Sequence, residues 1–168
     1  MNVTLEDLLA SRDARCLRET ELLRQFPSRT LVCLTVMMPG AEKRNGMSLR
    51  VAAAGVEAVR SRLQPSFEEL RDLETGYEAF FTVDAPVPEV KRRCCRIEDA
   101  HPLGRLMDLD VFEAAPAPRP VSREAVGLSP RRCLLCENEA RYCMRNHTHT
   151  TAQLLDRIRE MTEAYAKV

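Results

Sequence analysis

Two hydrophobic periods alternate along the chain, and together they predict a mixed α+β protein. In three segments before residue 100, apolar residues recur three or four positions apart, which predicts helices. These helices cover the N-terminal stretch from Thr4 to Phe26, residues 47–64 and residues 84–98. Thr4 and Asp7 have the spacing of a capping box, so the first helix is expected to begin there. Any break in that helix would fall near residues 11–13.

Short runs of β-branched, aromatic and other apolar residues lie between these helices and predict four strands, at 31–37, 67–73, 79–83 and 105–112. The first strand is nearly all apolar, as in a central strand that is covered on both faces. The predicted order is therefore βαββαβ, which is the order of the ferredoxin-like fold. In that fold, two helices cover one face of an antiparallel sheet. We expect such a core, with the N-terminal helix, in residues 1–113.

The last third of the chain has a different pattern. Residues 114–130 contain four prolines, which predicts a surface connector with one helical turn after Ser122. A segment rich in Cys and His follows it, and then an amphipathic last helix. The chain has 168 residues, which is typical of one domain, so residues 114–168 are expected to pack on the core. The last helix presents an apolar stripe of Leu154, Ile158, Met161 and Tyr165.

Charge and composition exclude several classes of protein. The 25 basic and 25 acidic side chains give a formal net charge of zero, which argues against a protein that coats nucleic acid. The longest apolar run, residues 31–38, is too short to span a bilayer, and the acidic start lacks the pattern of a signal peptide. Seven cysteines do not resemble a secreted disulfide framework. We therefore expect a cytoplasmic protein with neither membrane nor nucleic acid as partner.

Two carboxylates, Asp108 and Asp110, lie two residues apart in an apolar stretch. On an extended strand such residues point to the same side. Two like charges then repel each other unless a cation lies between them or one of them is protonated. Oxygen ligands of this kind hold Mg²⁺ in phosphoryl-transfer sites. The alternative is a solvated strand edge, because Asp-x-Asp is also common by chance.

Residues just before this pair suit the same chemistry. Arg105 can bind phosphate, and Gly104 lets a backbone pass closely. His101 can act as an acid, as a base or as a hydrogen-bond donor to phosphate. Glu98 is either a third metal ligand or an ordinary charge at a helix end. The basic run at residues 91–93 is typical of a solvated helix face, with binding of phosphate or of an acidic partner surface as the alternative.

A second group of candidate ligands lies within 17 residues. Cys133, Cys136, Cys143 and His149 have the types and the spacing that tetrahedral Zn²⁺ requires. Four protein ligands leave no open position, so such a zinc would be structural. His147 is an alternative fourth ligand. The competing interpretations are ordinary reduced cysteines beside a turn, and a redox CxxC pair that lacks its usual βαβ setting.

These motifs resemble the holo-[citrate lyase acyl-carrier-protein] synthase family, whose members are also called apo-citrate lyase phosphoribosyl-dephospho-CoA transferases. The central motif is His101-Pro-Leu-Gly-Arg-Leu-x-Asp-x-Asp-Val111. Met107 departs from it, since an aromatic residue is usual there and Met cannot stack on a base in the same way. Four shorter motifs follow the family's order: Ser11-Arg-Asp-x-Arg15, Met38-Pro-Gly-x-x-Lys-Arg-Asn45, Thr75-Gly-x-Glu78 and Arg132-Cys-Leu-Leu-Cys136.

The resemblance implies a nucleotidyltransferase. Members move the 2′-(5″-phosphoribosyl)-3′-dephospho-CoA group from 2′-(5″-triphosphoribosyl)-3′-dephospho-CoA to a serine of the apo acyl carrier protein of citrate lyase, and diphosphate leaves. Asp108 and Asp110 would hold catalytic Mg²⁺, and His101 or one of the aspartates would be the base. Arg105 would be a fourth catalytic residue, which clamps phosphate oxygens. The resemblance and the pattern together indicate these substrate-binding residues: Arg12, Arg15, Lys43, Arg44 and Gly104.

Two alternatives bear on this interpretation. For the zinc site, the resemblance favours His149 over His147, because the family places a histidine six residues after the third cysteine. For the function, the alternative is a zinc-knuckle module that binds protein or nucleic acid without catalysis. In that case Asp108 and Asp110 would be structural. The neutral net charge and the absence of Trp argue against binding of single-stranded nucleic acid.

Overall fold

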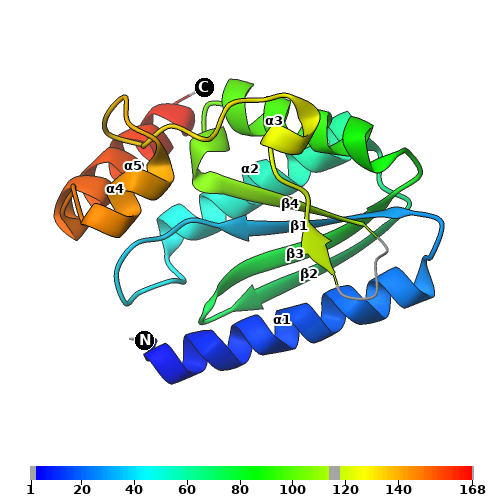
Figure 1. The fold of residues 1–168 in the computed structure, drawn as a ribbon. Helices are drawn as coiled ribbons and strands as arrows, with labels where there is room; N and C mark the ends of the chain where they lie inside the picture. The colour runs from blue at the N-terminus through cyan, green and yellow to red at the C-terminus, as the bar shows by residue number, and fades with distance from the viewer. Residues whose placement is uncertain (1–2, 114–117, 168) are drawn as a thin grey trace.

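The computed structural model of the protein describes residues 3–113 and 118–167. Within these residues, an antiparallel sheet of five strands runs through the middle of the molecule in the order β2-β3-β1-β4-β5 (Figure 1). The strands are β1 (Thr30–Val36), β2 (Phe67–Leu73), β3 (Gly76–Val83), β4 (Met107–Glu113) and the short β5 (Arg119–Pro120).

Helices cover both faces of this sheet (Figure 1). On one face lie α2 (Gly46–Leu63) and α3 (Val87–Ala100), and α1 (Leu5–Gln25) runs along the other. The remaining two helices, α4 (Ala140–Asn146) and α5 (Thr151–Tyr165), form a pair at one end of the molecule. None of the helices in the described part of the chain is both long enough and apolar enough to span a membrane.

Alternation along β1 divides the core into two clusters. Val32 and Leu34 belong to the larger cluster, beneath α2 and α3, whereas Leu31 and Cys33 belong to the cluster beneath α1. Both faces of β1 are therefore buried, as predicted for a central strand. Ile158 of α5 also joins the larger cluster, so the C-terminal pair of helices packs on the same core.

Local hydrogen bonds set the starts of α1 and α2 close to where the sequence predicts them, whereas α3, predicted at 84–98, spans Val87–Ala100 and has no side-chain cap. Thr4 and Asp7 form the expected capping box, and α1 then continues without a break through residues 11–13. Asn45 and Ser48 cap the start of α2 in the same way. The prediction of helices packed on an antiparallel sheet is confirmed. The sequence did not indicate that α1 covers the second face.

Three differences from the sequence prediction have local causes. The strand predicted at 105–112 begins later, because Gly104–Leu106 forms a 3-10 turn, η1, before β4 starts. Gly104 lies so close to the end of α3 that a Cβ there would be 2.4 Å from the Ile97 carbonyl oxygen. Neither α4 nor β5 was predicted, since both are too short to show a clear period.

The connector prediction is confirmed in part. The expected helical turn after Ser122 is present as a 3-10 turn at Glu124–Val126. Residues 114–117 of the predicted connector lie outside the described residues. The rest of the connector runs beside β4 and α3, where its arginines make the contacts described below.

Candidate active site

Asp108 and Asp110 project from the same face of β4, the face that α1 covers. In the register with β1, Asp108 lies opposite Thr35 and Asp110 opposite Cys33, while Leu109 between them is buried in the larger core cluster. Both aspartates line one cavity of about 330 Å³, which we call the β4 cavity. Its other charged walls include Lys91, Glu98, Arg105, Arg123 and Arg131.

Charged side chains form hydrogen bonds with the backbone groups at the edge of β4, beside these aspartates. The N–H of Leu109 donates to Glu98 Oε1 (2.9 Å), and Lys91 Nζ donates to the Leu109 carbonyl (3.3 Å). Arg131 Nη2 donates to the Met107 carbonyl (2.7 Å). The short β5 pairs only with the end of β4, so these backbone groups need other partners. Lys91 and Glu98 are accordingly buried, although the sequence indicated a solvated face for the basic run at 91–93.

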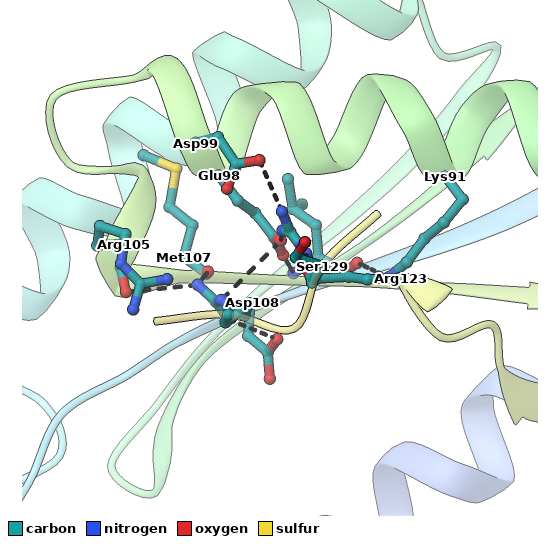
Figure 2. A network of polar contacts seen from close by, with 10 residues as sticks. Lys91, Glu98, Asp99, Arg105, Met107, Asp108, Arg123 and Ser129 are labelled. Carbon is teal, nitrogen blue, oxygen red and sulfur yellow. Dashed lines mark hydrogen bonds and ion pairs between the residues drawn. The ribbon is translucent and has the colours of Figure 1, made fainter. Parts of the chain in front are cut away.

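Arg123 links the connector to α3 beside the edge of β4. Its guanidinium donates to Glu98 Oε2 (2.9 Å), to Asp99 Oδ2 (2.6 Å) and to the Ser129 carbonyl (2.9 Å), as Figure 2 shows. Both oxygens of Glu98 are therefore engaged, one by Leu109 and the other by Arg123. This fits a structural carboxylate better than a third metal ligand.

Two arginines, Arg105 and Arg131, line the β4 cavity together with Asp108. Arg131 Nη1 is 3.1 Å from Asp108 Oδ1, and the Asp108 side chain extends toward the side of the sheet that α1 covers (Figure 2). Burial, together with the positive charge of Arg131, lowers the pKa of Arg105. Among the described residues, no carboxylate lies within 4.0 Å of the Arg105 guanidinium. Arg105 is therefore available to pair with an anion bound in the cavity.

The environment of Asp110 differs from that of Asp108. Burial, followed by the negative charge of Asp108, raises the pKa of Asp110 to about 6. In the described part of the chain, its carboxylate has no hydrogen-bond donor within reach, whereas Asp108 is paired with Arg131. The two carboxylates are thus adjacent but unequal, which is common where paired acids have different roles.

A second polar cavity of about 240 Å³ brings three of the sequence motifs together. This hairpin cavity, at the turn between β2 and β3, is lined by Ser11, Arg15, Thr35, Lys43, Thr75 and Glu78, among others. Thr35 lies opposite Glu78 on one side and opposite Asp108 on the other, so the cavity is one strand away from Asp108. Two predicted phosphate-binding cations, Arg15 and Lys43, therefore share one cavity near the aspartates.

Other predicted residues lie elsewhere. His101 ends α3, its Nδ1 accepts from the Leu103 N–H (3.0 Å), and its ring packs on Tyr165. His101 is not among the residues that line the β4 cavity. Arg12 is exposed on α1, and Arg44 makes a two-pronged pair with Asp72 at the surface (both contacts 2.8 Å).

Gly104 and Met107 are both buried. Gly104 packs against the end of α3, so the close backbone approach that it permits is to the helix. Met107 is fully buried in the larger core cluster. Neither Met107 nor an aromatic residue in its place would be exposed to stack on a ligand.

The predicted zinc ligands come together at the C-terminal end. The ligand atoms of Cys133, Cys136, Cys143 and His149 all lie within 4.8 Å of one another. Cys136 Sγ is 3.5 Å from Cys143 Sγ and 3.4 Å from His149 Nε2. Tetrahedral zinc would place two sulfurs about 3.8 Å apart, and a sulfur and a nitrogen about 3.5 Å apart. The cluster therefore fits a metal such as zinc, and His147, the C-cap of α4, is outside it.

Sequence reasoning missed Arg123 and Arg131, and it placed Lys91 on the surface. All three come from segments that look like ordinary solvated charge. The only sequence signal is a basic pair, Arg131-Arg132, directly before the first cysteine. Their role depends on an unpaired strand edge, which no local pattern reveals.

Comparison with known proteins is consistent with this geometry. Residues 3–165 match the family described as apo-citrate lyase phosphoribosyl-dephospho-CoA transferase. A probable apo-citrate lyase phosphoribosyl-dephospho-CoA transferase of Vibrio cholerae serotype O1 (strain M66-2) is 39% identical over 99% of this chain and 95% of that protein. A protein of the same name from Streptococcus pyogenes serotype M18 (strain MGAS8232) is 31% identical over 97% of this chain and 87% of that protein.

Proposed function

The chain belongs to the apo-citrate lyase phosphoribosyl-dephospho-CoA transferase family, and from this premise we propose that it loads the acyl carrier protein of citrate lyase with its prosthetic group. The donor is 2′-(5″-triphosphoribosyl)-3′-dephospho-CoA, and the acceptor is a serine hydroxyl of the apo carrier protein. The serine oxygen forms a bond to the phosphorus next to the ribose. The bond from that phosphorus to the departing diphosphate breaks, and the serine proton passes to a base.

One observation carries this proposal: Asp108 and Asp110 face a single cavity that also contains uncommitted positive charge. Phosphoryl transfer depends mainly on positioning and on neutralising the charge of the phosphates. Arg105 would bind the phosphate oxygens in the β4 cavity, where it lacks a carboxylate partner. Arg131 holds Asp108 in place and adds further positive charge beside it.

We propose that Asp108 and Asp110 also hold Mg²⁺. Their oxygens are the hard ligands that Mg²⁺ prefers, and Mg²⁺ commonly takes one or two carboxylates, with phosphates and water in its other positions. The described residues offer no group of three carboxylates close enough to hold a metal, so such open positions would remain. When bound, Mg²⁺ supplies charge neutralisation on the donor phosphates.

Asp110 is the better candidate for the base. The three groups considered from the sequence were His101, Asp108 and Asp110. His101 lies at the end of α3 with its Nδ1 already accepting a hydrogen bond, and Asp108 is paired with Arg131. The Asp110 carboxylate has no such partner among the described residues, so one of its oxygens can bind Mg²⁺ while the other accepts the serine proton.

The hairpin cavity supports a second part of the same site. Arg15 and Lys43 line it, and Thr35 connects it to Asp108 along one row of the sheet. We infer that these cations bind the departing diphosphate. Arg12 and Arg44 remain candidates for longer-range attraction of the anionic donor, because both are exposed.

The architecture and the C-terminal cluster fit this function. The strand order β2-β3-β1-β4, with α2 and α3 on one face, supports a ferredoxin-like core in residues 1–113. Residues 118–167 contribute Ile158 to that core, which supports a single domain. The Cys/His cluster would hold structural zinc. We also propose a cytoplasmic location, as inferred from the sequence. The non-catalytic zinc-knuckle module gains no support, since the relatives are named as transferases.

The direct test is to incubate the protein with apo carrier protein, the triphosphoribosyl donor and Mg²⁺, and then to measure the intact mass of the carrier. The expected result is a mass gain of one phosphoribosyl-dephospho-CoA group. A carrier whose acceptor serine is replaced by alanine should gain nothing, and EDTA should abolish the gain until Mg²⁺ is restored. An unchanged carrier mass in the complete reaction would refute the proposal.

A further inference from the structure

A third cavity, of about 410 Å³, adjoins the β4 cavity and differs from it in chemistry. It lies between the loop after β1, the turn η1 and the helices α4 and α5. We call it the methionine cavity, and its apolar wall consists mainly of Met37, Met38, Leu106, Met144, Leu154 and Ile158. Three members of the Cys/His cluster, Cys133, Cys143 and His149, also line it, so the proposed zinc site borders this cavity. Its volume lies within the range of about 300–1,000 Å³ that small-molecule sites occupy.

The methionine cavity is continuous with the β4 cavity. Met37, Arg105, Ala140 and Met144 line both of them. Arg105 therefore stands at the junction, with polar walls on one side and apolar walls on the other. A ligand whose phosphates are bound by Arg105 can extend from the charged cavity into the apolar one.

The lining suits a flat heteroaromatic ring. Met37 is 40% exposed and Met144 is 67% exposed, so two flexible thioethers stand at the surface of an apolar cavity. Methionine adapts its shape to a partner and makes favourable contacts between sulfur and aromatic rings. His147 and Thr151 are polar groups on the same lining that could meet the polar edge of a base.

We propose that the methionine cavity receives the adenine of the donor's dephospho-CoA moiety. This inference rests on the proposed function. In the donor, the phosphoribosyl group is attached to the adenosine, so the base must lie close to the phosphates. The walls of the β4 cavity are largely charged, and the neighbouring methionine cavity offers the apolar surface that a purine needs.

The test compares two substitutions on α4. Met144→Asn replaces an apolar side chain of the lining by a polar one without adding charge. Tyr142→Asn is the matched control, because Tyr142 is also an exposed apolar side chain on α4 (57% exposed) but is not among the cavity residues. Calorimetry measures binding of two probes, dephospho-CoA and inorganic diphosphate, and circular dichroism checks that each variant is folded.

Met144→Asn should weaken dephospho-CoA binding about fivefold, and Met37→Asn/Met144→Asn about tenfold or more, because apolar contact with the base is lost. Met144→Asn should weaken diphosphate binding much less than dephospho-CoA binding, because Met144 offers no charge to a phosphate, and Tyr142→Asn should bind both probes as the wild type does. Dephospho-CoA affinity that is unaltered in the double variant, or not measurable in the wild type, would overturn the assignment.

Failure of this inference can be told apart from failure of the proposed function. If the wild-type protein modifies the carrier but the Michaelis constant for the donor is the same in Met144→Asn, only the adenine assignment is wrong. If the wild-type protein modifies nothing, yet binds dephospho-CoA in a manner that depends on Met144, the assignment stands and the transferase function is wrong.

Discussion

The carboxylate of Glu98 accepts a hydrogen bond from the backbone N–H of Leu109 across 2.9 Å, between the two aspartates of β4. A helix residue thus takes the place that a neighbouring strand would occupy. Because Glu98 also pairs with Arg123, one buried side chain joins α3, β4 and the connector. The edge that carries Asp108 and Asp110 is held by this contact.

Removing this carboxylate should destabilise the protein strongly. Glu98→Ala leaves the Leu109 N–H and the Arg123 guanidinium without their partner, which we expect to cost about 3 kcal/mol of unfolding free energy. Glu98→Gln keeps an oxygen acceptor and should cost less. Urea denaturation of both variants measures the effect. Equal stability of wild type and Glu98→Ala would show that this contact does not hold the edge.

The aspartate pair should be essential for transfer and dispensable for folding. Asp108→Asn and Asp110→Asn are each expected to lower kcat/KM for the donor by about a hundredfold or more, since each removes a charge that serves Mg²⁺ or the serine proton. Asp156→Asn, an exposed change on α5, is the matched control and should have normal activity. Near-normal kcat/KM in either folded β4 variant would exclude that residue from the chemistry.

His101 should contribute to packing rather than to proton transfer. His101→Gln retains a side-chain acceptor for the Leu103 N–H but loses the ring contact with Tyr165. We expect a lower melting temperature and a kcat within about fivefold of the wild type, whereas loss of a general base costs about a hundredfold or more. A folded His101→Gln protein with a kcat reduced a hundredfold would move the role of base from Asp110 to His101.

Metal content should depend on one of the two candidate histidines. His149→Ala and Cys143→Ser each remove a member of the cluster and should lose zinc, as measured by mass spectrometry of the purified protein, and should unfold at lower temperature. His147→Ala changes a residue outside the cluster and should keep a full equivalent of metal. Zinc lost from His147→Ala but kept in His149→Ala would reverse the ligand assignment.

The free energy of unfolding should depend on pH through the ionisation of Glu19 on α1. Burial raises the pKa of Glu19 to about 7, above the ordinary value of 4.5 that applies in the unfolded chain. The folded state therefore binds this proton more tightly, so its contribution to stability is complete below pH 4.5 and is lost as the pH rises through about 7.

Glu19→Gln cannot ionise and should escape that loss. We expect this variant to be more stable than the wild type at pH 8, by at most about 3 kcal/mol, with the difference shrinking toward pH 4.5. Chemical denaturation at a series of pH values gives the comparison, and Glu21→Gln, an exposed neighbour on the same helix, is the control. Parallel stability curves for wild type and Glu19→Gln would contradict the raised pKa.

Several features of this protein follow from its sequence because their causes are local. The apolar periods of 3.6 and 2 residues define the main helices and strands, and the Thr4–Asp7 capping box marks the start of α1. The two-residue period of a strand places Asp108 and Asp110 on the same side of the sheet, regardless of what packs there. The spacing of Cys133, Cys136, Cys143 and His149 likewise indicates a ligand cluster without knowledge of the fold.

Tertiary structure alone decided what surrounds those residues. Nothing in the sequence showed that Lys91, Glu98 and Arg131 bind the backbone of β4, 11 to 24 residues away in the chain. His101 belongs to the same motif as the aspartates, but the turn η1 separates it from their cavity. The physical reason is that a backbone group at a strand edge needs a partner, and only the packing of α3 and of the connector determines which side chains reach it.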